Sequence, residues 1–230
     1  IEDMELILHP MVEDIKEAVG SMGDDTPTAV LSDRYRPLSH FFRQNFSQVT
    51  NPPIDSLREN EVMSLKTRFG NLGNILDFEN LTKDNIYVLE SPILSNSQFE
   101  KFKSYFGNKY EIIDCTFSMD ENLEISVNKI QQLSEVAVRK GVTQIILTDN
   151  KMSEKRCAIP MILCIGAINS HLTKLGLRGY VSINVQTGEA LDTHSFATLI
   201  GVGATTVNPY LALDSIYQRY KKKIVSMGRP

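Results

Sequence analysis

Residues 123–149 read LEISVNKIQQLSEVAVRKGVTQIILTD, and this stretch decides the fold. Apolar side chains recur at steps of three and four residues through its first part, which predicts an amphipathic helix over residues 123–140. A short run rich in β-branched residues follows at 143–149 and predicts a strand. The helix positions expected to face the core are Leu123, Val127, Ile130, Leu133 and Ala137. A helix leading directly into such a strand is typical of α/β folds.

Polar residues mark the ends of both elements. Asp120 or Asn122 can cap the start of the helix, and Gly141 can end it. The strand ends in a carboxylate, Asp149. Because α/β folds usually place their chemistry at the carboxyl ends of strands, Asp149 marks the edge of the sheet where functional groups are expected.

The same alternation continues on either side of this stretch, from about residue 86 onward. Strands are predicted over residues 86–90, 110–116, 143–149, 180–186 and 204–208. Helices are predicted over residues 95–106, 123–140, 159–175, 192–200 and 209–223. Alternation of this kind is typical of βα units around a parallel sheet. These units are too few for a closed eight-stranded barrel, so the fold class is α/β, an incomplete TIM-barrel-like domain with a largely parallel sheet.

The first third of the chain has a different pattern. Residues 3–19 suggest a helix, and residues 20–36 form a connector rich in Gly and Asp. A short helix is predicted over residues 38–48, with one apolar side expected to enter the core. That side consists of Leu38, Phe41, Phe42 and Phe46.

Bulk composition narrows the function classes. The 230 residues are 42% hydrophobic and 23% charged, as in ordinary globular proteins. The formal net charge of −4 does not favour nucleic acid or an anionic membrane as a partner. No apolar run approaches 18 residues, and the three cysteines suit a reducing compartment, so we expect a cytoplasmic location. Because the chain begins at Ile1 rather than Met, we expect it to be part of a longer polypeptide.

Nucleophiles and metal ligands are not assigned. An N-terminal-nucleophile glutaminase requires Cys as its first residue, whereas this chain begins with Ile1. Cys115 and Cys157 have no histidine close by in sequence, and Cys164 is expected to act as a small apolar residue in a helix. The histidines, His9, His40, His171 and His194, are isolated from one another, so no metal site is predicted.

Two short segments contain glycine or proline residues at positions that shape the backbone. Gly201 and Gly203 precede a predicted strand without a basic residue beside them, so they indicate a helix-to-strand turn rather than a flavin phosphate site. Residues 49–55, VTNPPID, contain two adjacent prolines, which fix their own φ angles and restrict the preceding residue. Thr50 and Asn51 are therefore held on a stiff loop, with a plain helix terminator as the alternative interpretation.

Longer strings resemble one known family. Residues 42–59, FRQNFSQVTNPPIDSLRE, closely resemble the central domain of the glutamate synthase large subunit. Upstream, GSMGDDTP at 20–27 and AVLS at 29–32 resemble the stretch that leaves the family's glutaminase domain. Downstream, TGEA at 187–190 and VNPYLA at 207–212 are similar to the far end of the central domain. The similarity spans nearly the whole chain in the expected order.

The resemblance implies a division of the chain and a role for it. Residues 1–36 would be the exit segment of the amidotransferase domain and a connector, and residues 37–230 the central domain. In this family the amidotransferase domain releases ammonia from L-glutamine. A later domain with FMN uses that ammonia, 2-oxoglutarate and electrons passed through a 3Fe-4S cluster to make L-glutamate. The central domain is described for the family as related to the FMN barrel but lacking flavin, and it joins the other two.

The resemblance also implies specific residues and partners. The family's ammonia passage would run near Thr50 and Asn51 and near the connector at Pro27, Thr28 and Ala29. No catalytic, cofactor-binding or metal-binding residue is expected in this chain, whose partners would be the neighbouring domains of the same polypeptide. The electron donor of the parent, an NADPH-, NADH- or ferredoxin-dependent system, stays open. A regulatory small-molecule-binding domain and a stand-alone flavin enzyme remain as alternatives.

The chain departs from the family pattern at two positions. Ser195 stands where the family commonly has a second histidine, and Val202 stands where it commonly has an aromatic residue. Any role that depends on either side chain is therefore not expected here.

Overall fold

The computed structural model describes residues 3–16, 33, 36–42, 56–70, 76 and 86–226. The chain divides into two compact units. The first consists of Ile1–Phe46 together with Ile93–Pro230, and the second of Ser47–Pro92. The first unit contains the alternating strands and helices expected from the sequence.

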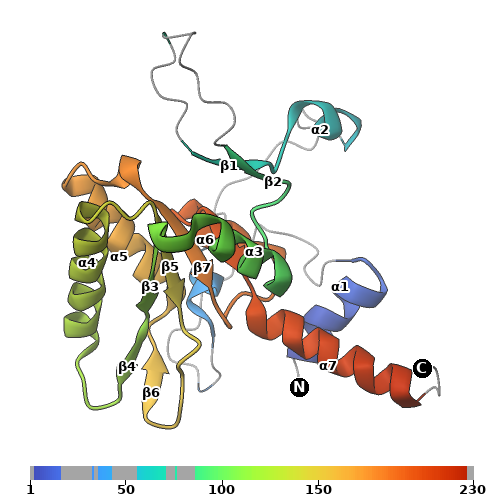
Figure 1. Ribbon diagram of the computed structural model, residues 1–230. Coiled ribbons are helices and arrows are strands. Elements are labelled where there is room, and N and C mark those ends of the chain that lie inside the picture. Colours follow the sequence, from blue (N-terminus) through green and yellow to red (C-terminus); the bar gives the residue numbers. More distant parts are fainter. Residues whose placement is uncertain are drawn as a thin grey trace. The chain divides into compact units, whose positions relative to one another are not determined.

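A four-stranded parallel sheet forms the centre of the first unit (Figure 1). Its strands are β3 (Tyr110–Asp114), β5 (Gln144–Thr148), β7 (Ser182–Gln186) and β8 (Thr206–Asn208), hydrogen-bonded in that order. Such a sheet, with helices between successive strands, confirms the α/β class and the incomplete barrel-like arrangement. The predicted strands over 143–149, 180–186 and 204–208 correspond to β5, β7 and β8.

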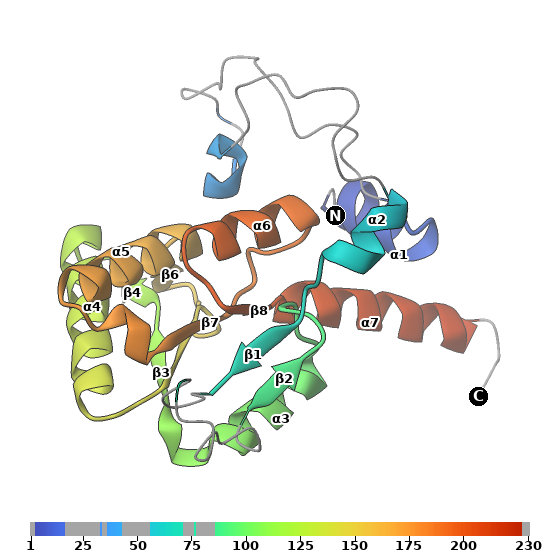
Figure 2. The ribbon, with the colours of Figure 1, turned by 90° about the horizontal axis from the view of Figure 1, so that it is seen from above.

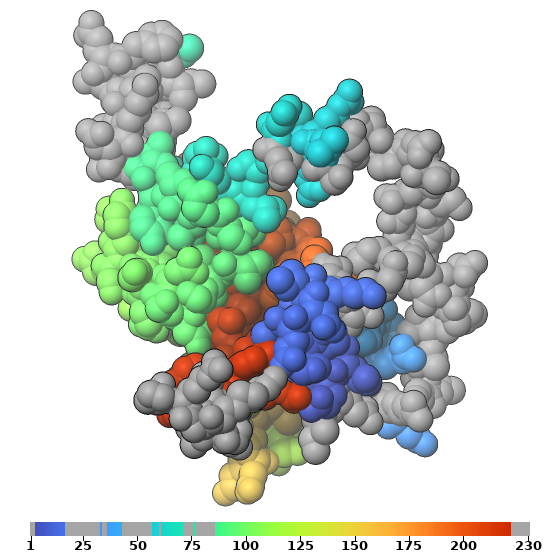
Figure 3. All heavy atoms as spheres, turned by 90° about the vertical axis from the view of Figure 1, so that its right-hand side faces the viewer, coloured from blue at the N-terminus to red at the C-terminus, as the bar shows by residue number. Residues whose placement is uncertain are grey.

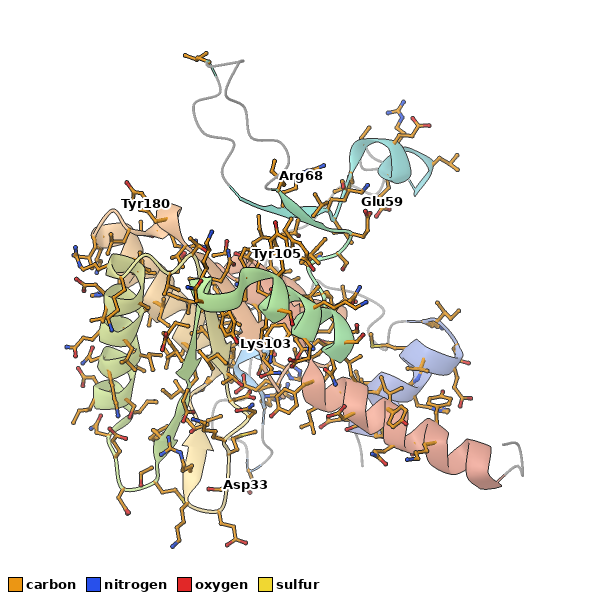
Figure 4. The ribbon with its side chains drawn as sticks, in the orientation of Figure 1. Asp33, Glu59, Arg68, Lys103, Tyr105 and Tyr180 are labelled. Atoms are coloured by element: carbon orange, nitrogen blue, oxygen red, sulfur yellow. The ribbon has the colours of Figure 1, made fainter. Side chains whose placement is uncertain are left out.

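Five helices connect and cover these strands. They are α3 (Asn96–Phe106), α4 (Leu123–Arg139), α5 (Met161–Lys174), α6 (Thr193–Gly201) and α7 (Tyr210–Ser226), each close to its predicted range. Figure 2 shows α4, α5 and α6 on one side of the sheet and α3 on the other. On α3, Phe99 and Phe102 are buried, whereas Tyr105 is half exposed (Figure 4). Both faces of the sheet are therefore covered by helices.

Local sequence signals explain where these helices begin and end. Asn122, not Asp120, caps α4, and its side-chain oxygen accepts a hydrogen bond from the Glu124 N–H at 2.8 Å. Asp192 caps α6 in the same way, accepting from the Ser195 N–H at 2.8 Å. Such caps satisfy backbone donors that have no partner within the helix. Gly141 follows α4 with φ of 88°, a conformation that glycine adopts without strain.

The core lies between the sheet and helices α4, α5 and α6. Its strand residues are Ile113, Ile145, Leu147, Ile183, Val185 and Val207, all buried. On α4 the buried stripe is Ser126, Ile130, Ser134, Ala137 and Val138. Leu123 and Leu133, which were predicted to be core, are 39% and 46% exposed. Small serines occupy the contact line, and this lets the helix approach the core closely while the larger leucines lie beside it.

The predicted strand over 86–90 is present but belongs elsewhere. It corresponds to β2 (Tyr87–Leu89) in the second unit, which pairs antiparallel with β1 (Thr67–Phe69) rather than joining the parallel sheet. β1 was not predicted, because three residues are too few to show an alternating pattern. Ile93, a few residues further on, does lie beside the parallel sheet, forming a bridge with Val207.

The predicted strand over 110–116 is interrupted at its end. Cys115 separates β3 from a second short strand, β4 (Thr116–Ser118), which pairs antiparallel with β6 (Arg156–Ala158). The Arg156 guanidinium fixes this small sheet by donating to Thr116 Oγ1 at 2.9 Å and to Asp114 Oδ2 at 3.3 Å. These polar contacts were not foreseen from the alternation pattern.

The described parts of the first third only partly match expectation. The predicted helix over 3–19 appears as a π-helical turn, Met4–Leu8, followed by α1, His9–Glu13. The predicted helix over 38–48 begins as a 3₁₀ turn, Leu38–Phe41, after which the backbone is extended at Phe42. Leu38, Phe41 and Phe42 are 37%, 42% and 43% exposed, so their assignment to the core was wrong, because the four-residue turn ends at Phe41 and does not continue as the amphipathic helix that would bury them. Phe46 lies outside the described residues. In the second unit, residues Ser56–Val62 form helix α2.

The N-terminal turns lie against the last helix, as Figure 3 shows for the blue and red segments. Arg219 of α7 donates to both carboxylate oxygens of Glu5, at 2.6 and 3.2 Å. Tyr220 Oη donates to Glu13 at 3.1 Å. Segments more than 200 residues apart in sequence are thus joined by a bidentate ion pair. Within the described ranges, no helix is both long enough and apolar enough to cross a membrane.

Candidate functional site: the carboxyl end of the parallel sheet

Asp149, the carboxylate singled out from the sequence, lies directly after β5 and is fully buried. One of its oxygens accepts a hydrogen bond from Thr187 Oγ1 at 2.5 Å. Both oxygens accept from the Gly188 N–H, at 3.1 and 3.0 Å. A buried carboxylate is stable only when such donors replace water. Asp149 therefore fastens the end of β5 to the loop that follows β7.

Glu189 lies next in that loop, beside the amino end of α5. Its Oε2 accepts a hydrogen bond from the N–H of Met161, the first residue of α5, at 3.1 Å. Burial raises the pKa of the Glu189 carboxyl, the Met161 N–H lowers it, and the nearby Asp149 charge raises it again. The net upward shift shows that desolvation outweighs the hydrogen bond from the helix end.

Tyr210 approaches the same place from the start of α7. Burial and the charge of the nearby Asp149 carboxylate raise the pKa of Tyr210 to about 12. A Cβ added to Gly188 would lie 3.2 Å from Leu211 Cδ2 and 3.4 Å from Tyr210 Oη. The space beside Gly188 is thus already filled by side chains of α7. We call Asp149, Thr187, Gly188, Glu189 and Tyr210 the carboxyl-end cluster.

Below this cluster, polar side chains of β5, β7 and β8 lie on the face of the sheet that is turned away from α4, α5 and α6. Asn184 Nδ2 donates to Gln144 Oε1 at 3.0 Å, and Thr206 Oγ1 donates to Asn184 Oδ1 at 2.7 Å. These three residues are buried and lie on three neighbouring strands, so they form a row across the sheet. Each of these amide and hydroxyl groups therefore has a hydrogen-bonding partner on a neighbouring strand.

A second polar row lies nearer the carboxyl end. Thr148 Oγ1 donates to Gln186 Oε1 at 3.2 Å, and Gln186 Nε2 donates to Asn208 Oδ1 at 3.3 Å. Asn208 Nδ2 in turn donates to the Leu94 carbonyl at 3.0 Å and to Asn96 Oδ1 at 2.9 Å. The interior face that a typical barrel fills with Val, Ile and Leu is here held together by uncharged hydrogen-bonding side chains.

At the opposite, amino end of the sheet, the guanidinium of Arg178 joins neighbouring segments of the chain by hydrogen bonds. Arg178 donates to Asn169 Oδ1 at 2.7 Å, to the Val181 carbonyl at 2.5 Å and to the Gly203 carbonyl at 3.0 Å. Gly203 has φ of 128°, and its N–H donates to the Ile200 carbonyl at 3.0 Å. The glycine element predicted as a helix-to-strand turn is confirmed as one, running from α6 into β8.

The thiols and imidazoles are dispersed through the structure. Cys115 and Cys164 are buried, whereas Cys157 is exposed. A contact with Cys115 and burial raise the pKa of the Cys164 thiol well above its usual range, so it is a poor nucleophile, as its assignment as a small apolar residue predicted. His171 contacts Glu135 at 2.9 Å, and His194 contacts the Ser39 carbonyl at 2.9 Å. Among the described residues, no group of three or more His, Cys, Asp or Glu side chains could hold a metal ion.

The carboxyl-end cluster is thus a set of groups that bind one another. Asp149 accepts from Thr187 and Gly188, and Glu189 accepts from Met161. A catalytic acid or base needs a proton-transfer partner on a substrate within hydrogen-bonding reach. Here Asp149 and the Glu189 Oε2 atom already accept hydrogen bonds from groups of the domain itself.

Comparison with known proteins agrees with the sequence motifs. The model of the glutamate synthase central domain matches residues 1–229. The chain belongs to this family. It is 60% identical over 225 residues to the large chain of the NADPH glutamate synthase of Azospirillum brasilense, covering 96% of this chain and 15% of that protein. It is 43% identical over 227 residues to the corresponding large chain of Bacillus subtilis, covering 97% of this chain and 14% of that protein.

A ferredoxin-dependent relative is also similar. The chloroplastic ferredoxin-dependent glutamate synthase of Spinacia oleracea is 38% identical over 237 residues, covering 99% of this chain and 14% of that protein. The central domain described here therefore spans about one seventh of the length of the relatives it matches.

The two departures from the central-domain pattern have structural roles here. Ser195 Oγ accepts from the Asp192 N–H at 3.0 Å and so completes the cap of α6. Val202 follows the last residue of α6 and packs, partly buried, against the core. Neither position requires a histidine or an aromatic ring for the contacts that are seen.

The sequence predicted some of these placements and missed others. Thr50, Asn51, Pro27, Thr28 and Ala29, the predicted wall of the ammonia passage, all lie outside the described residues. Asp149 is at the predicted edge of the sheet. Glu189 and Tyr210 were missed, although both belong to strings that carried the family resemblance. Their positions directly after β7 and β8 are the signal that could have identified them.

Proposed function

We propose that this central domain is a non-catalytic spacer in a glutamate synthase, where it holds the glutaminase and FMN synthase domains of one polypeptide in position. The single observation that supports this most strongly is the carboxyl-end cluster. Asp149 and Glu189 lie where α/β enzymes place their catalytic groups, yet they accept hydrogen bonds from Thr187, Gly188 and Met161 of the same domain. A domain that uses this edge to fix its own loops is suited to act as a rigid spacer.

The parent protein would make L-glutamate from L-glutamine and 2-oxoglutarate in the cytoplasm. In this proposal FMN and the 3Fe-4S cluster belong to other domains of the parent, and this domain binds neither. The relatives are named for NADPH in two cases and ferredoxin in another, so either donor is compatible with this central domain. The division of the chain into an exit segment, residues 1–36, and a central domain, residues 37–230, is part of the same proposal.

We further propose that the domain contributes to the wall of an ammonia passage. Ammonia that meets bulk water at neutral pH is protonated and lost, so a passage needs a narrow and stiff wall. Thr50 and Asn51 precede two prolines, and Thr28 and Ala29 follow Pro27. Fixed φ angles at these prolines reduce the freedom of the neighbouring backbone.

Substitution of Thr50 in the full-length parent tests this role. Thr50→Trp should leave glutamine hydrolysis in place while glutamine-dependent glutamate synthesis falls, and added ammonia should restore part of the synthesis. Thr50→Ser, which keeps the size and the hydroxyl, is the matched control and should behave as wild type. If Thr50→Trp still forms one glutamate per glutamine consumed at the wild-type rate, the loop does not line the passage.

A further inference from the structure

One flank of α4 carries an exposed apolar stripe. Ile125, Leu133 and Val136 are 60%, 46% and 48% exposed. Together with Lys129 they follow one another at steps of four, four and three residues, so their side chains share one line along the helix. Lys140, one turn further, extends the same line. We call these five residues the α4 stripe.

The direction of this stripe follows from what the other sides of α4 contact. Gln131 Nε2 donates to the Ala167 carbonyl of α5 at 3.1 Å, and Glu135 contacts His171 of α5 at 2.9 Å. Ile130 and Ala137 point into the core. With 100° between successive residues, the α4 stripe lies on the flank opposite α5, towards the free edge of the sheet.

That edge is strand β3. In the described part of the chain, β5 is its one strand partner. Every second residue of an edge strand turns its N–H and C=O groups away from the sheet, where another strand can pair with them. Ile112, in the middle of β3, is 48% exposed on the face opposite α4. The free edge therefore has exposed apolar side chains on both of its faces.

We propose that a segment of the same polypeptide, outside these 230 residues, docks on this edge, extends the sheet at β3 and covers the α4 stripe. The inference rests on the proposed spacer function. The domain spans 14–15% of the length of the large chains that it matches, so most of such a polypeptide lies outside it and is held near it at high effective concentration. The segment would present apolar side chains to Ile112 and Val136 and acidic side chains to Lys129 and Lys140.

Cysteine labelling in the full-length polypeptide tests this docking. Val136→Cys places a thiol in the stripe, and Asn128→Cys places one at an exposed position of α4 outside it. Each variant is treated with a polar maleimide, and the labelled peptides are quantified by mass spectrometry. In the native protein Val136→Cys should react at least about tenfold more slowly than Asn128→Cys, whereas in urea the two rates should be equal.

Two results would overturn the proposal. Equal native rates for the two thiols would show that the stripe faces solvent. Protection of Val136→Cys that disappears on dilution to monomers would show that a second copy covers the stripe. The native Cys164 is buried, so it should stay unlabelled in each variant as long as the domain is folded. If Val136→Cys does not fold by this criterion, Leu133→Cys takes its place. Because labelling needs no turnover, its result is separate from the outcome for Thr50→Trp.

Discussion

The two ends of the parallel sheet are closed by opposite kinds of charge. At the amino end, the permanently charged Arg178 donates to Asn169 and to the carbonyls of Val181 and Gly203. At the carboxyl end, the carboxylates of Asp149 and Glu189 accept from hydroxyl and backbone donors. In α/β enzymes the amino end usually serves stability and the carboxyl end serves chemistry.

In the proposed spacer, both ends of the sheet serve stability. At each end, a buried or half-buried charged side chain forms hydrogen bonds with segments that lie elsewhere in the sequence. Burial lowers the pKa of the Arg178 guanidinium and raises the pKa of the Glu189 carboxyl, so in both cases it disfavours the charged form.

The largest effect is expected at the carboxyl end, from Asp149→Ala. Thr187 Oγ1 and the Gly188 N–H would lose their acceptor in a buried place, which should lower the free energy of unfolding by about 3 kcal/mol. Urea unfolding followed by circular dichroism measures this, with the exposed Asp120→Ala as control. If Asp149→Ala lowers the free energy of unfolding no more than the control does, water replaces the carboxylate, and the hydrogen bonds of Asp149 are not needed for stability.

At the amino end, Arg178→Ala should have the next largest effect. Removal of three hydrogen bonds from a half-buried guanidinium should lower the free energy of unfolding by about 2 kcal/mol. Arg178→Lys should recover only part of the loss, because one ammonium group cannot reach acceptors on Asn169, Val181 and Gly203 together. Full stability of the lysine variant in the same unfolding assay would contradict the role given to the planar guanidinium.

Gly203→Ala tests the backbone of that end. Its φ of 128° strains any residue with a Cβ, and the added Cβ would lie 2.8 Å from Asn169 Cγ. We expect a loss of about 1–2 kcal/mol in the free energy of unfolding. Gly201→Ala is the matched control, since nothing lies within 4 Å of its added Cβ, and it should leave the melting temperature unchanged or slightly higher. If Gly203→Ala and Gly201→Ala change the free energy of unfolding equally, the alanine at position 203 is not strained.

The smallest effect concerns pH. The pKa of Glu189 is raised above 4.5 in the folded chain, mainly by burial. Between the unfolded and folded pKa values the folded chain binds more protons than the unfolded chain, so its stability falls as pH rises through this window. Glu189→Gln removes the titration and keeps an acceptor for the Met161 N–H. Its melting temperature relative to wild type should therefore rise from acidic to neutral pH, and a constant difference would contradict the raised pKa.

The sequence predicted the periodic elements well and the short ones poorly. α4 and β5 have long, regular patterns, and both appear where expected. β1, β4 and β6, three residues each, were not predicted as separate strands. β2 and β8 are equally short, but they lie within longer runs of β-forming residues and were predicted. Phe41 and Phe42 have the spacing of a buried helix face but lie exposed, because a backbone pattern does not reveal what packs against it.

The candidate site shows the same limit. Asp149 was recognisable because it ends an apolar strand. Glu189 and Tyr210 gain their environment from contacts across the fold, with Met161 and with Asp149, which no local spacing encodes. Family resemblance identified the strings that contain them without assigning either residue a task.

The central claim is that the carboxyl end of the sheet is a structural closure and not an active site. Glu189→Gln in the full-length parent tests it most directly, with glutamine-dependent glutamate synthesis measured per folded protein. The account predicts a kcat within about twofold of wild type, whereas loss of a general acid or base would lower kcat by about a hundredfold or more. A fall of that size with an unchanged melting temperature would contradict the account.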